Sequence, residues 1–467
     1  MSPGRLALAG LLIAGVVAAG WWRHGAAAPV YGAAAGSGPA LPRDASELGP
    51  IGPFPCLADM MTAWRSCAGG TEPEAWRYAQ QAEAALRTVG DLVSAGQSAQ
   101  AEAQVKQARD LSAKAYWSSF HSPSPEIRGM WAYPWPEEGV RSWDQAMARL
   151  AQAHFNVIFP YMASAGVAYY PSAVLPRAEE AENYDYLRAA VTAGQAHGIE
   201  VHARLLALSC LFASPAQKSA LAAQGRLAVN GRGKTTDWLC PTDPRNEEQL
   251  LAVATEIATR YPVQGIQLDY FRYDDTDTCV CPRCRAEFEK AAGVRATRWP
   301  QDVTSGPLRA QFLKWRQERL TALLRDLRRQ LQAVRPDLRL SVAVFPNWRT
   351  TAENVGQTPA EWAKQGLVDF LCPMDYTSDL QRFQGYVNTQ TTQLAGAVPL
   401  AVGIGACADN CPFHSPQQLA DQILAARAQG AAGFVVFNYN PRLVTDFLPW
   451  VELGITRRPA VPGWPGS

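Results

Sequence analysis

Short apolar runs alternate with amphipathic stretches eight times after residue 126. The amphipathic stretches include 143–153, 184–197, 247–261, 309–334 and 416–429. The apolar runs end in turn-like residues and cover 127–133, 156–163, 199–209, 265–273, 338–348, 368–376, 398–406 and 433–441. Eight strand–helix units within about 320 residues predict an α/β fold of the (β/α)8 (TIM) barrel type.

A doubly wound sheet would also alternate strands and helices. It normally has fewer units and a glycine-rich phosphate-binding turn after its first strand. The run 127–133 is followed by no such turn. We therefore expect one barrel over residues 126–454, with residues 455–467 forming a C-terminal tail.

Two segments of different composition precede the predicted barrel. Residues 72–120 are rich in Ala, Gln, Glu and Arg, with a break near 94–96, which predicts two helices forming a hairpin. Residues 29–71 are rich in Ala, Gly and Pro and are predicted to form a flexible tether.

The first 28 residues have the layout of an export signal. Arg5 precedes an apolar run from Leu6 to Trp22, and the small residues 26–28 follow it. A run of this length is also at the lower limit for a membrane-spanning helix. We predict that residues 1–28 are a signal peptide or a membrane anchor, and that the rest of the chain is exported to the periplasm or the exterior.

The amino-acid composition limits the kinds of molecule that this protein is expected to bind. Hydrophobic residues make up 48% of the 467 residues, so the chain can bury a full core. Lys and Arg number 43 against 42 Asp and Glu, a formal net charge of +1. That balance argues against a nucleic-acid binder relying on counterion release and against a polybasic membrane-surface protein. Any membrane contact is expected only through the N-terminal anchor.

The ten cysteines are expected to form disulfides, because export places them in an oxidising compartment. Cys279, Cys281 and Cys284 have a spacing seen in zinc sites, but structural zinc takes four ligands and no second pair follows. Disulfides are favoured there, zinc is the alternative, and no metal or cofactor is predicted. The distant partners considered are Cys210, Cys240 and Cys372, and the local pairs are Cys56–Cys67 and Cys407–Cys411.

In a (β/α)8 barrel, the site lies at the carboxyl ends of the strands. Along the third strand, His202 and Arg204 share the parity of Glu200, and such inward polar residues need hydrogen bonds or a ligand. Along the fourth strand, Gln267 and Asp269 share a parity. Asp269 is thus predicted to face inward near the rim, within reach of Arg204.

Other strand ends supply Trp131, Asn347, Trp348, Asp375 and Asn438. Carboxylates, amides and aromatic rings at a barrel mouth indicate glycoside chemistry. The sequence contains no HxH, HExxH or GxSxG motif, which disfavours a His-ligated metallohydrolase and a serine hydrolase. The structural alternatives are a core role for Asp269, a loop cap for Asp375, and ordinary packing for the aromatic residues.

Several segments resemble the bacterial glycosyl-hydrolase-like family 10 barrels, in order from about Arg128 to Pro441. They are RGMWAYPW, NVIFPYMASAGVAYYPSAVLP, GIEVHAR, LCPTDPRN, GIQLDYFRYDD, CVCPRC and DFLCPMDYT. The resemblance implies action on bacterial envelope or extracellular polysaccharides, with Asp269 as the leading catalytic carboxylate. The chain departs from it where relatives often show Asn in PMNYT and this chain has Asp375. Related glycosidase barrels also end the fourth or fifth strand with a Glu that this chain lacks.

The resulting hypothesis is an exported glycoside hydrolase without a cofactor. Asp269 would act as nucleophile or electrostatic stabiliser, and Asp375, or else Asp274 or Asp275, as proton donor. The rival hypotheses are a catalytically inactive glycan-binding barrel and an envelope interaction protein that uses its helical hairpin. The residues expected to bind the sugar are Trp131, Tyr161, His202, Arg204, Gln267, Arg272, Asn347, Trp348 and Asn438.

Overall fold

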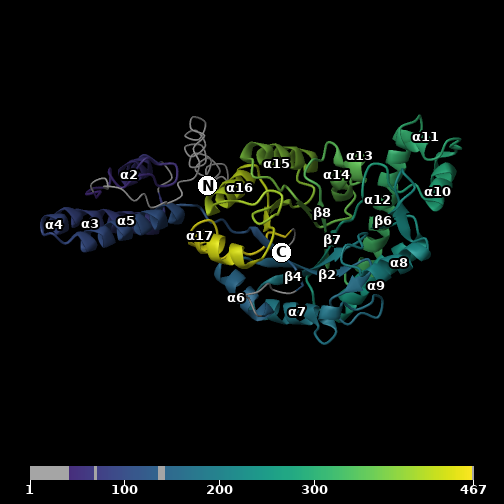
Figure 1. The fold of residues 1–467 in the computed structure, drawn as a ribbon, viewed down its shortest axis with the longest axis horizontal. Coiled ribbons are helices and arrows are strands. Elements are labelled where there is room, and N and C mark those ends of the chain that lie inside the picture. The colour runs from purple at the N-terminus through teal and green to yellow at the C-terminus, as the bar shows by residue number, and fades with distance from the viewer. Residues whose placement is uncertain (1–40, 68–70, 135–141, 465–467) are drawn as a thin grey trace, which may run out of the picture. The chain divides into compact units, whose positions relative to one another are not determined.

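A computed structural model describes residues 41–67, 71–134 and 142–464 (Figure 1). The predicted signal peptide or anchor at 1–28 lies outside the described residues. Within the described ranges, no helix combines the length and apolarity that crossing a membrane requires.

Eight parallel strands form a nearly closed barrel, as predicted. Each strand pairs with the next, and β11 pairs with β1 through Ile127 and Gly433. Isolated bridges at Leu371–Leu400 and Met374–Gly403 link the remaining edges. The strands are β1 (Ile127–Ala132), β2 (Val157–Ser164), β4 (Glu200–Leu206), β7 (Gly265–Asp269), β8 (Arg339–Val344), β9 (Phe370–Pro373), β10 (Ala401–Ile404) and β11 (Gly433–Val436).

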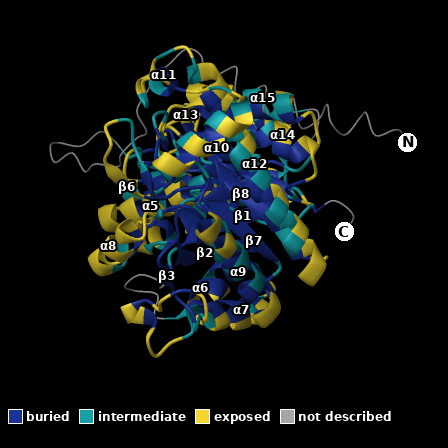
Figure 2. Ribbon diagram, turned by 90° about the vertical axis from the view of Figure 1, so that its right-hand side faces the viewer, coloured by how far each residue is buried: buried dark blue, intermediate teal, exposed yellow. Residues whose placement is uncertain are grey.

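Helices follow the strands and bury one side each, so that the strands are dark blue and the outer helix faces yellow in Figure 2. Helix α9 shows how the sequence sets a helix start: Asp243 accepts a hydrogen bond from the Arg245 amide, and Pro244 occupies the first turn. The helices between the strands are α6 (Trp143–Gln152), α7 (Tyr186–His197), α9 (Pro244–Arg260), α12 (Arg309–Val334), α13 (Thr351–Val355), α14 (Pro359–Lys364) and α15 (Leu380–Leu394).

Additional elements lie in the loops at the carboxyl ends of three strands. After β2 comes β3 (Val167–Ala168), which pairs antiparallel with β2. Between β4 and α9 the chain forms α8 (Pro215–Ala223) and a hairpin of β5 (Leu227–Val229) and β6 (Thr235–Leu239). Between β7 and α12 it forms α10 (Pro282–Ala292) and α11 (Gln301–Thr304). These elements do not follow the eightfold pattern and were not predicted.

The amino end of the barrel is closed by a side chain from the end of the chain. Trp464 stacks on the ring of His202 with centroids 5.8 Å apart, and its indole nitrogen donates to Glu200 at 3.0 and 3.1 Å. Arg339, the first residue of β8, pairs with Glu200 at 3.4 Å. Above this polar group, Phe159 and Phe370 fill the interior.

The remaining described residues up to Pro123 form a separate compact unit with residues 414–424 and 445–459. Its long helices α3 (Pro73–Arg87) and α5 (Ser98–Ser118) bury rows of alanines. Part of the predicted tether forms helix α2 (Leu57–Arg65), because its apolar residues form one buried stripe. The other helical elements here are α4 (Val89–Ser94), α17 (Leu448–Leu453) and part of α16 (Pro416–Ala428), and η3 (Leu443–Phe447) spans the boundary of the unit.

Candidate active site

Asp269 is the last residue of β7 and lies at the rim of the barrel interior, 4% exposed. Its Oδ2 accepts a hydrogen bond from Arg204 Nη1 at 3.2 Å, and its Oδ1 accepts one from the Tyr270 amide at 2.7 Å. The second guanidinium nitrogen of Arg204 donates to the Ala132 carbonyl at 3.2 Å. One buried ion pair therefore ties together the carboxyl ends of β1, β4 and β7.

Tyr270, directly after Asp269, has a backbone φ of +51°. A bulky residue in the left-handed region is strained, and such strain persists only where the surroundings enforce it, often at functional sites. The turn at Tyr270 takes the chain out of the barrel and leaves its amide directed at the Asp269 carboxylate. The local backbone thus fixes the orientation of this carboxylate.

A layered group of aromatic rings and one guanidinium follows Asp269. The Arg272 guanidinium lies 4.5 Å from the ring centroid of Trp238, 4.4 Å from that of Phe345 and 5.1 Å from that of Tyr270. Trp238 and Tyr270 are themselves 5.4 Å apart. Burial lowers the pKa of Arg272, and the charge of Asp269 opposes that effect. Trp238 comes from β6, a hairpin that the eightfold pattern does not reveal, so sequence reasoning missed it.

A second aromatic group lines the ends of β1, β2 and β4. Tyr161 is fully buried, packed 4.8 Å from Phe212 and 5.2 Å from Tyr169 between ring centroids, and burial raises its pKa well above the usual value. Phe212 also contacts Tyr133, and both are half-buried. The exposed ring surface thus belongs to Tyr133 and Phe212, which were not predicted. Both follow strand ends, where the barrel rule would have found them.

Asp274 is a half-buried carboxyl in the segment that follows Asp269. Burial raises its pKa, the charges of neighbouring acidic residues add to that effect, and Arg272 opposes it. Arg272 acts electrostatically on both Asp269 and Asp274. Two carboxyl groups with different environments therefore experience the charge of one guanidinium.

The structure does not place Asp375 among these residues. Its carboxyl Oδ1 accepts a hydrogen bond from Gln390 Nε2 of α15 at 2.7 Å, and the residue is fully buried. On β9 and just after it, Phe370, Cys372 and Met374 contact the barrel interior, so Asp375 has the opposite parity. It faces the helical layer, and burial raises its pKa well above the usual value.

Two predicted sugar-binding residues belong to the packed middle of the barrel. The indole of Trp131 donates to Gln267 Oε1 at 2.6 Å, and Gln267 Nε2 lies 3.5 Å from Ser341 Oγ. Trp131 is 1% exposed, so its ring offers no surface for stacking. Trp131 is the second-last residue of β1, and the apolar run in the sequence did not show where within it the strand ends.

His202 lies deeper than predicted, near the amino end of the barrel. Its Nε2 is 3.2 Å from Glu200 Oε2, beneath the level of Arg204 on the same strand. Burial lowers the pKa of His202, and the hydrogen bond to Glu200 opposes that effect. The inward-facing polar residues of β4 therefore lie at two levels of the barrel. His202 contacts Glu200 near the amino end, and Arg204 contacts Asp269 near the carboxyl end.

The last predicted residues lie in loops after β8 and β11. The Asn347 side chain is exposed, whereas Trp348 is buried. Asn438 is also buried and accepts a hydrogen bond from Asn440 Nδ2 at 3.1 Å. None of these contacts joins them to Asp269.

All ten cysteines lie in the described ranges, and none forms a disulfide there. The predicted local pairs are not formed: Cys56 Sγ is hydrogen-bonded to Asp59, and Cys411 Sγ to Asn410. Four other cysteines converge on one point, including Cys240, which was considered only as a disulfide partner.

The fold and the carboxylate at its rim define a glycoside-hydrolase-like barrel. The chain belongs to the glycosyl hydrolase-like 10 family, whose model matches residues 126–419. This is the family that the sequence segments resemble.

Curated relatives and solved structures are similar to parts of this chain. Glycosyl hydrolase DigH of Escherichia coli K12 is 21% identical over 284 residues, covering 52% of this chain and 60% of that protein. The chain thus spans 60% of the length of the curated relatives that it matches. The PgaB (BpsB) glycoside hydrolase domain from Bordetella bronchiseptica superposes with a TM-score of 0.55 at 15% identity, over 67% of this chain and 94% of that one. The β-amylase catalytic domain from Paenibacillus polymyxa gives a TM-score of 0.50 at 13% identity, over 68% and 94% respectively. At these identities the two structures show the shared fold.

Proposed function

We propose that this protein is an exported glycoside hydrolase that cleaves a bacterial envelope or extracellular polysaccharide. The observation that carries the proposal is the Asp269 carboxylate at the end of the fourth barrel strand, fixed by Arg204 at 3.2 Å. Catalytic groups of this fold lie at that end of the strands. The family membership supports the same reaction class.

In this proposal Asp269 stabilises the positive charge that develops on the sugar ring, as a nucleophile or as a fixed anion. Arg204 and the Tyr270 amide hold the carboxylate in one orientation before substrate arrives. A charge held in place in advance needs no reorganisation during the reaction. Arg204 is therefore a positioning residue.

Asp274 is the proposed proton donor. A general acid must carry a proton near the working pH, and burial moves the pKa of Asp274 in that direction. Asp375 also has a raised pKa, but its carboxyl is bonded to Gln390 on the outer side of β9. This position favours Asp274 over Asp375 for the role.

The proposed substrate class rests on two features. The half-buried rings of Tyr133, Phe212 and Tyr270 beside the rim offer flat apolar faces, which suit the C–H faces of sugars. The formal net charge of +1 suits a neutral or mixed-charge glycan. The layout of residues 1–28 supports export, which would bring the barrel to envelope or extracellular glycans.

One observation favours a second function, a glycan-binding barrel without activity. Glycosidases of this kind use two carboxyl groups across the scissile bond. The residue first predicted for the second role, Asp375, faces away from the barrel interior. If neither Asp274 nor the neighbouring Asp275 supplies the proton, none of the predicted donors remains to pair with Asp269, and a glycan-binding role would follow.

The test is product analysis by mass spectrometry on a glycan panel that includes peptidoglycan strands. We expect cleavage by the full chain, loss of turnover in Asp269→Asn and Asp274→Asn, and turnover retained in Asp375→Asn. Asp277→Asn is the matched control, an acidic residue of the same loop whose Oδ2 accepts the Gly231 amide at 3.1 Å.

Equal turnover by wild type and Asp269→Asn would overturn the catalytic assignment. Saturable glycan binding without products from any variant would establish the second function. Fractionation of cells producing the full chain tests export, and recovery of the protein only with the cytoplasm would refute that part.

A further inference from the structure

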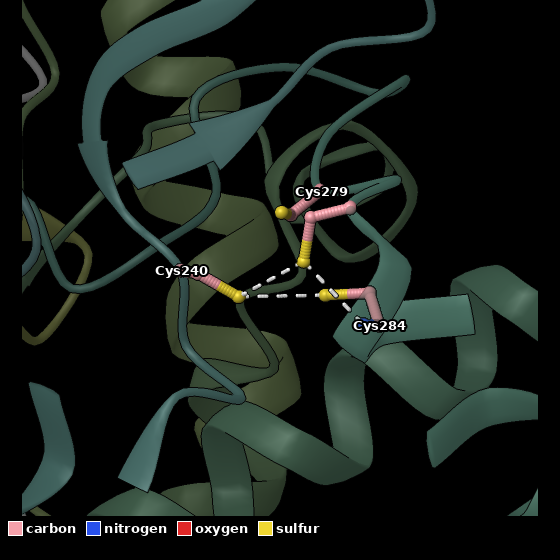
Figure 3. Close-up of side chains that lie close together, drawn as sticks. Cys240, Cys279 and Cys284 are labelled. Atoms are coloured by element: carbon pink, nitrogen blue, oxygen red, sulfur yellow. Dashed lines mark hydrogen bonds between the residues drawn. The ribbon is translucent and has the colours of Figure 1, made fainter. Parts of the chain in front are cut away.

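Four cysteine sulfurs meet where the insertion after β4 and the segment after β7 come together (Figure 3). Cys240 directly follows β6, whereas Cys279 and Cys281 come from the segment between β7 and α10, and Cys284 lies in the first turn of α10. The four Sγ atoms all lie within 4.8 Å of one another, and all four residues are buried. Two loops that are separate along the chain thus contribute to one sulfur group.

The sulfur spacing fits a single tetrahedral ion. Cys240 Sγ lies 3.7 Å from Cys281 Sγ and 3.5 Å from Cys284 Sγ. Four sulfurs each about 2.3 Å from a zinc ion would be about 3.8 Å apart. A disulfide would instead bring two sulfurs to about 2.05 Å. The arrangement therefore matches a metal site and not a pair of disulfides.

Hydrogen-bond donors surround the sulfurs as they do in thiolate sites. The amide of Val229 donates to Cys279 Sγ at 3.3 Å, and the amide of Cys284 donates to Cys281 Sγ at 3.4 Å. The Thr242 hydroxyl lies 3.0 Å from Cys240 Sγ and 3.1 Å from Cys284 Sγ. Such outer contacts orient and stabilise metal-bound thiolates.

The start of α10 also favours negative charge on this group. Cys281 is the N-cap of α10, an 11-residue helix, and Cys284 lies in its first turn. The positive end of the helix dipole stabilises thiolates at such positions. Cys210 and Cys372 are equally buried but lie outside the group, so burial alone does not explain the convergence.

We propose that Cys240, Cys279, Cys281 and Cys284 bind one zinc ion. A set of four thiolates in tetrahedral array selects zinc among the common divalent ions. Because all four positions come from the protein, none is open to a substrate, and the role of the ion is structural. This proposal is independent of the proposed hydrolase activity.

The ion would brace the mouth of the barrel. It joins the hairpin that carries Trp238, two residues before Cys240, to the loop that carries Tyr270 and Arg272. Those three residues belong to the layered group next to Asp269. Arg316 of α12 holds the same loop by donating to the carbonyls of Asp275 and Thr276, each at 2.6 Å.

Metal content of the wild-type chain is the primary test, measured by inductively coupled plasma mass spectrometry after purification in zinc-containing, chelator-free buffer. We expect one zinc ion per chain, and replacement by Co²⁺ giving the intense visible bands of a tetrahedral thiolate site. Intact mass under non-reducing, denaturing conditions should show all four cysteines as thiols. Iron in place of zinc, disulfides among these residues, or metal-free thiols would each overturn the proposal.

Variants test the assignment of the ligands. Cys240→Ala should abolish stoichiometric zinc binding, whereas Cys210→Ala, equally buried in the preceding loop, should retain one zinc per chain. Removing zinc from the wild type should increase hydrogen exchange in residues 227–240 and 270–284, and adding zinc back should restore protection. If Cys240→Ala fails to fold, the exchange experiment on the wild type still decides the matter. Unchanged exchange after complete zinc removal, or full zinc binding by a folded Cys240→Ala, would refute it.

Discussion

Replacing Asp375 by Asn tests whether this buried carboxyl is structural. Asn has nearly the same shape, and its side-chain oxygen can still accept the hydrogen bond that Gln390 makes at 2.7 Å. The second carboxyl oxygen of Asp375 is buried and has no hydrogen-bond partner among the described residues. Burial raises the pKa of Asp375, so the native state keeps this proton at pH values where an unfolded chain releases it.

The size of the effect follows from proton linkage. An Asp in an unfolded chain titrates near pH 3.9, so above about pH 4 the unfolded state binds fewer protons than the native state. The titration of Asp375 then lowers the free energy of unfolding by about 1.4 kcal/mol for each unit by which the pH rises, until the pH reaches the pKa of Asp375 in the native state. Stability from the protonated carboxyl is thus complete at low pH and is lost as pH rises. Asn does not titrate, so the stability advantage of Asp375→Asn over the wild type should grow as pH rises above about 4.

The assay is urea unfolding of the full chain between about pH 4 and pH 7. The difference between variant and wild type isolates this group from other titrating residues, and Asp110→Asn on the exposed face of α5 serves as control. Parallel pH dependence of Asp375→Asn and wild type would refute the reasoning. So would a folded Asp375→Asn that has lost glycan turnover, because the carboxyl would then act on substrate.

Three further predictions concern other charged or aromatic groups. Arg204→Met should lower the free energy of unfolding of the barrel by about 3–5 kcal/mol in urea titrations, because it leaves the buried Asp269 carboxylate uncompensated; a loss below about 1 kcal/mol would contradict the buried ion pair. Burial raises the pKa of Asp421 to about 7, so wild-type stability should fall as pH rises from about 4 to 7, and Asp421→Asn should remove that component; identical pH profiles would disprove it. Trp464→Ala should cost about 3–5 kcal/mol in thermal or urea unfolding yet leave glycan affinity unchanged; a folded variant with lost affinity would instead place Trp464 in the binding site.

The barrel and its central carboxylate were accessible from sequence because both depend on short-range patterns. Asp269 is the last residue of a run in which polar residues occupy alternate positions, so its side chain is predicted to face inward. The eightfold repeat places the end of that run at the barrel mouth. Asp375 follows a run in which the residues of both alternating sets are apolar. The sequence therefore does not show whether the Asp375 side chain faces the barrel interior or the helices. Its partner Gln390 comes from a helix whose packing the sequence does not reveal.

The residues that the sequence did not reveal depend on inserted elements. Trp238 and Cys240 belong to a hairpin inserted between β4 and α9, and their partners come from the loop after β7. No periodicity relates these two loops. The spacing of Cys279, Cys281 and Cys284 therefore looked incomplete, although the fourth sulfur lies 3.5 Å from Cys284 in space.

The closure of the barrel base has a consequence for the order of events during synthesis. Trp464 bonds to Glu200, 264 residues earlier, and the amide of Glu126 donates to the Val461 carbonyl. Until residues 461–464 leave the ribosome, a nascent barrel would leave Glu200 and the rings of His202 and Phe370 uncovered at its amino end. Folding intermediates that expose apolar surface are prone to aggregate. We therefore expect the base of this barrel to close only after all eight of its strands have been made.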